Sequence, residues 1–200
     1  MLGTALIGAS SRADEPGEAD PHAHHRAMMA APAPVRRSEV SYQVPAVRLV
    51  RDDGQTVALR DELAGDRPVV LAFIYTSCTT VCPLTSQTLA QLQSRLGPAR
   101  DQVRIVSISI DPEQDTPARL ADYAKTFHAG PEWHHYTGAL AASLAAQRAF
   151  DVYRGNKMNH APAILVRPSA EAAWVRFDGF ATADQLMAEL PHLSPAPAAR

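Results

Sequence analysis

The spacing of apolar residues divides the chain into parts. Residues 14–37, rich in alanine, proline, histidine and glutamate, follow neither a helical nor a strand period, and regular patterning begins near Ser41. From there, two short apolar stretches flank Asp53 and Gly54, a pair that is typical of tight hairpin turns. The run RPVVLAFIY, residues 67–75, is almost continuously apolar, which predicts a central strand covered on both faces.

Helical and strand patterns then alternate. Residues 83–97 space their leucines as a helix does, beginning with proline and ending with glycine. Residues 102–110 predict a second buried strand, and residues 116–130 predict a second helix with Thr116 as its N-cap. The rest of the pattern predicts a third helix, a strand hairpin and a closing helix, at residues 138–150, 161–177 and 182–190.

This order of elements predicts an α/β fold, a thioredoxin-like three-layer sandwich with a central mixed sheet and an N-terminal β-hairpin. Parallel strands need helical crossovers, and the right-handed rule for these crossovers leaves few other topologies. We expect this domain to cover residues 41–191 and a disordered tail to cover residues 192–200.

Residues 1–40 are expected to lie outside the domain. MLGTALIGASSRA, residues 1–13, resembles the remnant of an export signal, because a short apolar stretch precedes a small-x-Ala site. This predicts an exported protein, either periplasmic or on the outer face of the cytoplasmic membrane. A membrane tether is compatible with this location, although none is visible in the chain. The linker is expected to be disordered, and two interpretations of its histidines and methionines stay open, a plain polar linker or a copper-capturing tract. These residues are His22, His24, His25, Met28 and Met29.

Composition narrows the classes of function. The 200 residues are 46% hydrophobic and 20% charged, which is ordinary for a globular protein with a real core. The net charge of −2 and the scattered basic residues provide no electrostatic surface for nucleic acid. We therefore expect no nucleic-acid partner. A monomer is our separate expectation.

The chain's two cysteines, Cys78 and Cys82, lie in the segment SCTTVCP between the predicted central strand and its helix. In α/β sheets, sites lie at the carboxyl ends of strands, where this segment falls. Two cysteines are too few for a disulfide scaffold, and their spacing fits both a redox dithiol and a clamp for a soft metal. Because Pro83 places Cys82 near the helix start, the helix dipole and free amides are expected to lower the pKa of its thiol.

A distant histidine is the candidate third donor. Two thiolates satisfy Cu(I), whereas Cu(II) favours an additional imidazole. In the predicted fold, His160 stands just before a strand of the same sheet, in a loop that faces the cysteine turn. Met158 is expected to make a hydrophobic contact, with a thioether ligand as the alternative.

Other polar residues have weaker support as site residues. Asp111 follows the second buried strand and is expected to form a turn and capping cluster with Asp115 and Thr116. The alternative is that Asp111 does not bind the metal itself but supports and orients the residues that do. His134 and His135 are expected in a surface loop.

Several segments together resemble the SCO/SenC family of copper-delivery proteins. They are FIYTSCTTVCPLTSQTLAQLQSRL, VRIVSISIDPEQDTPARLADYAKTF, WHHYTG and a later histidine before a strand, and the match runs from about Ser41 to Leu190. The most specific parts are the Cys-x-x-x-Cys-Pro turn and SIDPEQDTP in register with it. The chain departs from the family in its aliphatic HAPAILV segment, which carries Pro162.

The resemblance implies a thioredoxin-like copper-binding protein whose ligands are Cys78, Cys82 and His160. It further implies a metallochaperone that delivers copper to the dinuclear copper site of cytochrome c oxidase, or reduces the thiols of that site. The partner would be a copper-accepting oxidase subunit or another copper chaperone.

The alternative function is a thiol–disulfide oxidoreductase that uses the Cys78/Cys82 dithiol. Pro162 stands where such enzymes carry a cis-proline beside their dithiol, and an imidazole at His160 is not needed for their chemistry. A peroxidase on the same fold has less support, because no motif supplies an activating arginine near the cysteines.

Overall fold

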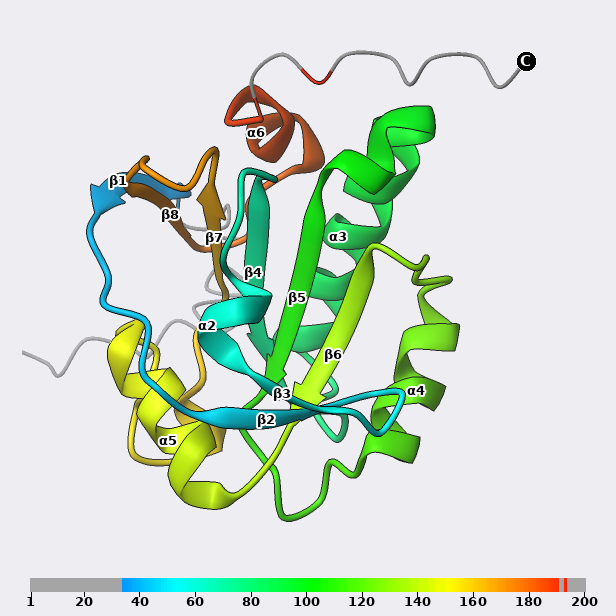
Figure 1. Ribbon diagram of the computed structural model, residues 1–200, viewed down its shortest axis with the longest axis vertical. Helices are drawn as coiled ribbons and strands as arrows, with labels where there is room; N and C mark the ends of the chain where they lie inside the picture. Colours follow the sequence, from blue (N-terminus) through cyan, green and yellow to red (C-terminus); the bar gives the residue numbers. More distant parts are fainter. Residues whose placement is uncertain (1–33, 191–192, 194–200) are drawn as a thin grey trace, which may run out of the picture. The chain divides into compact units, whose positions relative to one another are not determined.

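The computed structural model describes residues 34–190 and residue 193 (Figure 1). The predicted export signal, the histidine- and methionine-containing tract and the tail, except for residue 193, lie outside the described residues. Within the described part of the chain, no helix is long and apolar enough to cross a membrane.

One mixed sheet of eight strands forms the centre of the fold, in the order β1-β8-β7-β4-β5-β6-β2-β3 (Figure 1). The central strand β4 pairs in parallel with β5 and antiparallel with β7, and β5 pairs in parallel with β6. The strands are β1 (Arg36–Val40), β2 (Arg48–Arg51), β3 (Thr56–Ala58), β4 (Val69–Ile74), β5 (Arg104–Ser109), β6 (Trp133–Thr137), β7 (Ala163–Arg167) and β8 (Trp174–Asp178).

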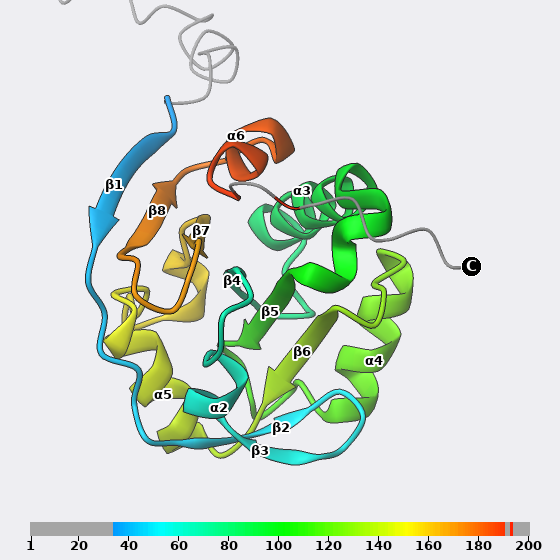
Figure 2. The ribbon, with the colours of Figure 1, turned by 45° about the horizontal axis from the view of Figure 1, so that its top comes forward.

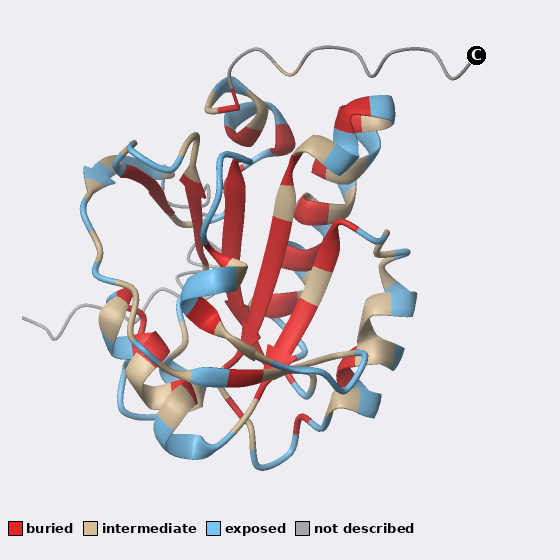
Figure 3. Cartoon of the chain, in the orientation of Figure 1, coloured by how far each residue is buried: buried red, intermediate tan, exposed pale blue. Residues whose placement is uncertain are grey.

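Helices cover both faces of this sheet (Figures 1 and 2). Side chains of β4 alternate between the two faces: Val70 and Ala72 pack with α3 and α6, whereas Leu71 and Phe73 pack with α2 and α5. Every residue of β4 is buried, as the apolar run predicted (Figure 3). The helices are α2 (Leu59–Glu62), α3 (Val81–Leu96), α4 (Pro117–Thr126), α5 (Leu140–Ala149) and α6 (Ala183–Ala188), with 3₁₀ turns η1 (Gly97–Gln102) and η2 (Lys157–Asn159).

Most of the predicted elements are present. The β2–β3 hairpin turns at Gly54, whose φ of 85° favours glycine. Helix α4 begins after Thr116, whose side chain accepts a hydrogen bond from the amide of Arg119. The β7–β8 hairpin and the closing helix also lie where the pattern places them.

Two strands were missed. Strand β1 lies within the stretch assigned to the linker, and it pairs with β8 along Arg36 to Val40. The segment expected as a surface loop around His134 and His135 is strand β6, and the His135 side chain is 0% exposed. This strand was missed because its sequence, WHHYT, is neither a continuous apolar run nor an alternation of apolar and polar residues.

Candidate metal centre

The cysteine turn connects the end of β4 to the start of α3. Cys78 lies in the turn and is 6% exposed, whereas Cys82 is the second residue of α3 and is 0% exposed. The amide of Cys82 donates a hydrogen bond to Sγ of Cys78 over 3.4 Å, and both thiols are free. The wider Cys-x-x-x-Cys spacing therefore does bring both cysteines to one place.

The two thiols have opposite electrostatic environments. Burial opposes ionisation of Cys78, but the amides of Cys82 and Thr80 donate to its sulfur and outweigh burial, so its pKa falls to about 7. Burial dominates at Cys82 and raises the pKa of that thiol. The expectation that the helix start lowers the pKa of Cys82 is wrong, because the first-turn amide is directed at the sulfur of Cys78.

Asp115 fixes the cysteine turn to the segment that follows β5. Its carboxylate accepts hydrogen bonds from the amide of Thr76 at 3.2 Å and from the Thr76 hydroxyl at 2.5 Å. It also accepts one from the hydroxyl of Ser109 at 2.6 Å, and the residue is fully buried. Sequence reasoning placed Asp115 only in a capping cluster, because its hydrogen bond to Thr76 depends on the parallel pairing of β4 with β5.

His160 lies in the loop between η2 and β7. Its Nε2–H donates a 2.9 Å hydrogen bond to the main-chain carbonyl of Phe73 on β4, and its ring stands edge-on to Tyr75 at 6.4 Å between centroids. Burial lowers the pKa of His160, so the neutral imidazole is favoured. With Nε2 protonated, the lone pair is on Nδ1. A histidine that binds a metal through one ring nitrogen usually donates from the other in this way.

Lys157 joins this loop to the rest of the site. Its Nζ forms a 2.5 Å ion pair with the buried carboxylate of Asp111 and lies 5.7 Å from the centre of the Tyr75 ring. The main-chain carbonyl of Asp111 accepts from the amides of Gln114 and Asp115, as the predicted turn requires. Asp111 thus contributes its backbone to the turn and its side chain to the loop that carries His160.

Two expectations about this loop are wrong. Met158 makes no buried hydrophobic contact: it is 73% exposed, and its Sδ lies 4.0 Å from the Tyr75 hydroxyl. The comparison of Pro162 with a cis-proline also fails, since none of the peptide bonds in the described chain is cis.

The donor types present fit a copper ion, with two sulfurs side by side and an imidazole lone pair on the neighbouring loop. The described residues nevertheless contain no group of three or more histidine, cysteine or acidic side chains gathered closely enough to hold a metal. The structure therefore brings Cys78 and Cys82 together and places His160 nearby, without closing the three into one coordination sphere.

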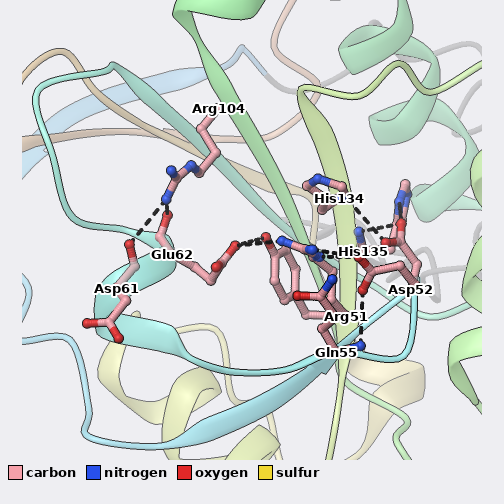
Figure 4. Close-up of polar contacts among 10 residues, drawn as sticks. Arg51, Asp52, Gln55, Asp61, Glu62, Arg104, His134 and His135 are labelled. Carbon is pink, nitrogen blue, oxygen red and sulfur yellow. Dashed lines mark hydrogen bonds and ion pairs between the residues drawn. The ribbon is translucent and has the colours of Figure 1, made fainter.

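The other two candidate histidines belong to a separate cluster at the edge of the sheet. Figure 4 shows the carboxylate of Asp52 near both of them, with Nδ1 of His134 at 3.2 Å and Nδ1 of His135 at 3.5 Å. The His135 amide also donates to Asp52, and its ring stacks on Trp133. These residues connect β2 to β6 and take no part in the cysteine site.

Comparison with known proteins gives a consistent family match. The model of the SCO1/SenC family matches residues 37–192. A SCO1 protein homolog of Bacillus subtilis strain 168 is 35% identical over 104 residues, which are 51% of this chain and 52% of the relative. The matched segment thus spans about half the length of that curated relative.

Solved structures show the same fold. The copper-bound ScoI of Bradyrhizobium japonicum superposes with a TM-score of 0.60 at 26% identity, covering 72% of this chain and 94% of that one. BsSco, a member of the Sco family of cytochrome c oxidase assembly proteins with an identified disulfide switch, superposes with a TM-score of 0.65 at 22% identity, covering 80% and 98%. These likenesses confirm the predicted thioredoxin-like fold.

Proposed function

The chain belongs to the SCO1/SenC family, and from that premise we propose that it binds one copper ion through Cys78, Cys82 and His160. The observation that carries the proposal is the pair of free thiols that the turn brings together, Cys78 at 6% exposure with a lowered pKa and Cys82 at 0% exposure with a raised pKa. Thiolates suit Cu(I), and the added imidazole suits Cu(II).

The roles of the three residues follow from their surroundings. With a pKa of about 7, Cys78 is about half ionised at neutral pH and makes the first bond. Cys82 must release its proton to make the second, so loading liberates a proton from the buried thiol. His160 offers Nδ1 while the carbonyl of Phe73 holds its Nε2–H, which fixes the tautomer that a metal needs.

We further propose that the protein works outside the cytoplasm and passes its copper to a partner in cytochrome c oxidase assembly. The support is the family match and the relatives, which include a copper-bound Sco protein and a member of the oxidase assembly group. The acceptor would be the copper-binding subunit of the oxidase or another copper chaperone. Transfer by ligand exchange suits sulfur donors, because Cu(I)–thiolate sites accept an incoming thiolate readily.

A second candidate function is thiol–disulfide exchange, and a specific observation favours it. A thiol with a pKa of about 7 is a competent nucleophile at neutral pH, and the buried Cys82 could act as the resolving thiol. His160 discriminates between the two functions, because disulfide exchange between these cysteines does not require an imidazole donor.

The first test is an absorption titration of the reduced protein with Cu(II), comparing the wild type with His160→Ala. The expected result is a stable thiolate-to-copper charge-transfer band that saturates near one equivalent and is lost in the variant. His128→Asn is the matched control, since His128 is exposed, lies away from the site and has a positive φ of 54° that asparagine tolerates.

The opposite result would favour the oxidoreductase. Rapid bleaching with formation of a Cys78–Cys82 disulfide, equal in the wild type and His160→Ala, would show that Cu(II) acts only as an oxidant. In that case the copper-binding proposal fails.

A further inference from the structure

Met158 is the most exposed of the large hydrophobic side chains in the described chain, and it lies beside the cysteine site. At 73% exposure it gains little from burial, which is the usual reason for a methionine in a folded protein. Met187, in contrast, packs against the core from α6. An exposed thioether that lies against Tyr75, just before the cysteine turn, therefore needs another explanation.

The backbone around Met158 is ordered by its own short turn. The side chain of Asn156 accepts a 2.9 Å hydrogen bond from the Met158 amide and caps η2. The amide of His160 donates to the carbonyl of Lys157 over 3.0 Å, which closes the turn. Because Lys157 is paired with Asp111 and His160 with Phe73, the residues on both sides of Met158 are anchored to the site.

Tyr75 connects the thioether to the cysteines. Its hydroxyl lies 4.0 Å from Sδ of Met158 and also hydrogen-bonds with Cys78. The exposed thioether and the reactive thiol thus share one hydroxyl.

We propose that Met158 is a third, soft ligand for Cu(I), which meets the ion at the surface and shares it with Cys78 and Cys82. This inference rests on the proposed copper-binding function. A thioether carries no charge and needs no deprotonation, so it favours Cu(I) over Cu(II) and leaves His160 as the donor that matters for Cu(II). Each oxidation state then has its own third ligand on the same turn, Met158 or His160. Exchange of one sulfur donor for another involves no electron transfer.

The test follows the methionine methyl groups directly. Reduced protein labelled with ¹³C at the methionine methyl carbons is titrated with Ag(I), a redox-inert probe for Cu(I), and the Met158 signal is assigned with Met158→Leu. We expect that signal to shift and to saturate at about one equivalent of Ag(I), because thioethers bind soft monovalent ions. The bound ion would be the one that Cys78 and Cys82 also hold. The signal of Met187 should stay unchanged.

Affinity provides the second readout. In competition with a chromophoric Cu(I) chelator, Met158→Leu should bind Cu(I) about tenfold more weakly than the wild type. This is the lower end of the loss in metal affinity that substitutions around a metal site typically cause. Its Cu(II) charge-transfer band should be unaltered. Met187→Leu is the matched control and should behave as the wild type.

The outcomes separate this inference from the proposed function. If cysteine-dependent binding persists while the Met158 signal and the affinity of Met158→Leu are unchanged, the thioether is not a ligand and the copper site stands. If Cys78→Ser and Cys82→Ser bind Ag(I) and Cu(I) as the wild type does, the proposed site itself is wrong, and the inference falls with it.

Discussion

The imidazole of His160 is hydrogen-bonded through Nε2 to the main-chain carbonyl of Phe73. Phe73 lies near the end of β4, two residues before the first residue of the cysteine loop. The hydrogen bond joins the loop before β7 to strand β4. Strands β7 and β4 themselves pair antiparallel in the sheet. A candidate ligand is therefore held by backbone rather than by another mobile side chain. Its orientation is as well determined as the central strand.

The two thiols should react at very different rates with an alkylating agent. In the reduced protein, Cys78 should be modified by iodoacetamide with a pH midpoint near 7, since its pKa is about 7. Cys82 should stay unmodified well above that pH, because burial raises the pKa of its thiol and shields it. Peptide mass spectrometry after timed quenching measures both rates. Equal rates at neutral pH would refute the assigned asymmetry.

Replacing Asp115 with asparagine should loosen the cysteine turn. The amide group of asparagine presents a donor toward Thr76 and Ser109, which already donate, so the free energy of unfolding should fall by about 1–3 kcal/mol. Urea titration measures this loss, and Cys82 should also become easier to alkylate. Asp122→Asn, which removes only an exposed pair with Lys125, should stay within about 0.5 kcal/mol of the wild type.

Asp52 should make stability depend on acid pH. Burial alone would raise the pKa of this carboxyl, but hydrogen bonds from His134 and His135 outweigh it and lower the pKa. Because the pKa of Asp52 is lower in the folded state, its carboxylate contributes its full stabilisation at pH values above the unfolded-state pKa of about 3.9. This stabilisation is lost as the pH falls through the pKa of Asp52 in the folded protein.

The corresponding variant is Asp52→Asn. At neutral pH it should lose about 1–2 kcal/mol of unfolding free energy, the scale of hydrogen bonds to a charged group. The difference from the wild type should shrink steadily below about pH 4. Urea titrations at several pH values measure it, and a difference that stays constant down to acid pH would show that the carboxylate charge is irrelevant.

The histidine- and methionine-containing tract can be tested by deletion. Removing residues 21–29 should lower the number of copper ions bound by about one if the tract is a separate site, because imidazole and thioether are suitable copper ligands. Metal analysis after dialysis gives the stoichiometry, and the charge-transfer band of the cysteine site should survive the deletion. Unchanged stoichiometry would assign the tract to plain linker.

The fold was largely predictable because its central strands are covered on both faces. The continuous apolar run at β4 indicated that helices cover the sheet on both faces, and caps such as Thr116 marked where a helix starts. The edge strand β1 was missed because its sequence, RRSEV, is mostly polar and its pairing partner lies far along the chain. Its place in the sheet depends on β8 and not on its own pattern.

The site was only partly predictable. The turn itself is local, so the nearness of Cys78 and Cys82 followed from spacing. The assignment of the lower pKa was wrong, since it depends on which sulfur the first-turn amide reaches and which one the core covers. The Asp115–Thr76 contact is tertiary and gave no local signal. His160 as a ligand stays a prediction.

In the proposed copper site, the depth of Cys82 would determine the order of events when copper leaves. Because Cys82 is 0% exposed and Cys78 is 6% exposed, an ion held by both sulfurs would be approached from the side of Cys78. A partner cannot draw the ion through the molecule, and its own donor must arrive before the inner bond is released. Exchange is then associative, and its rate should rise with the concentration of the acceptor instead of being limited by spontaneous dissociation.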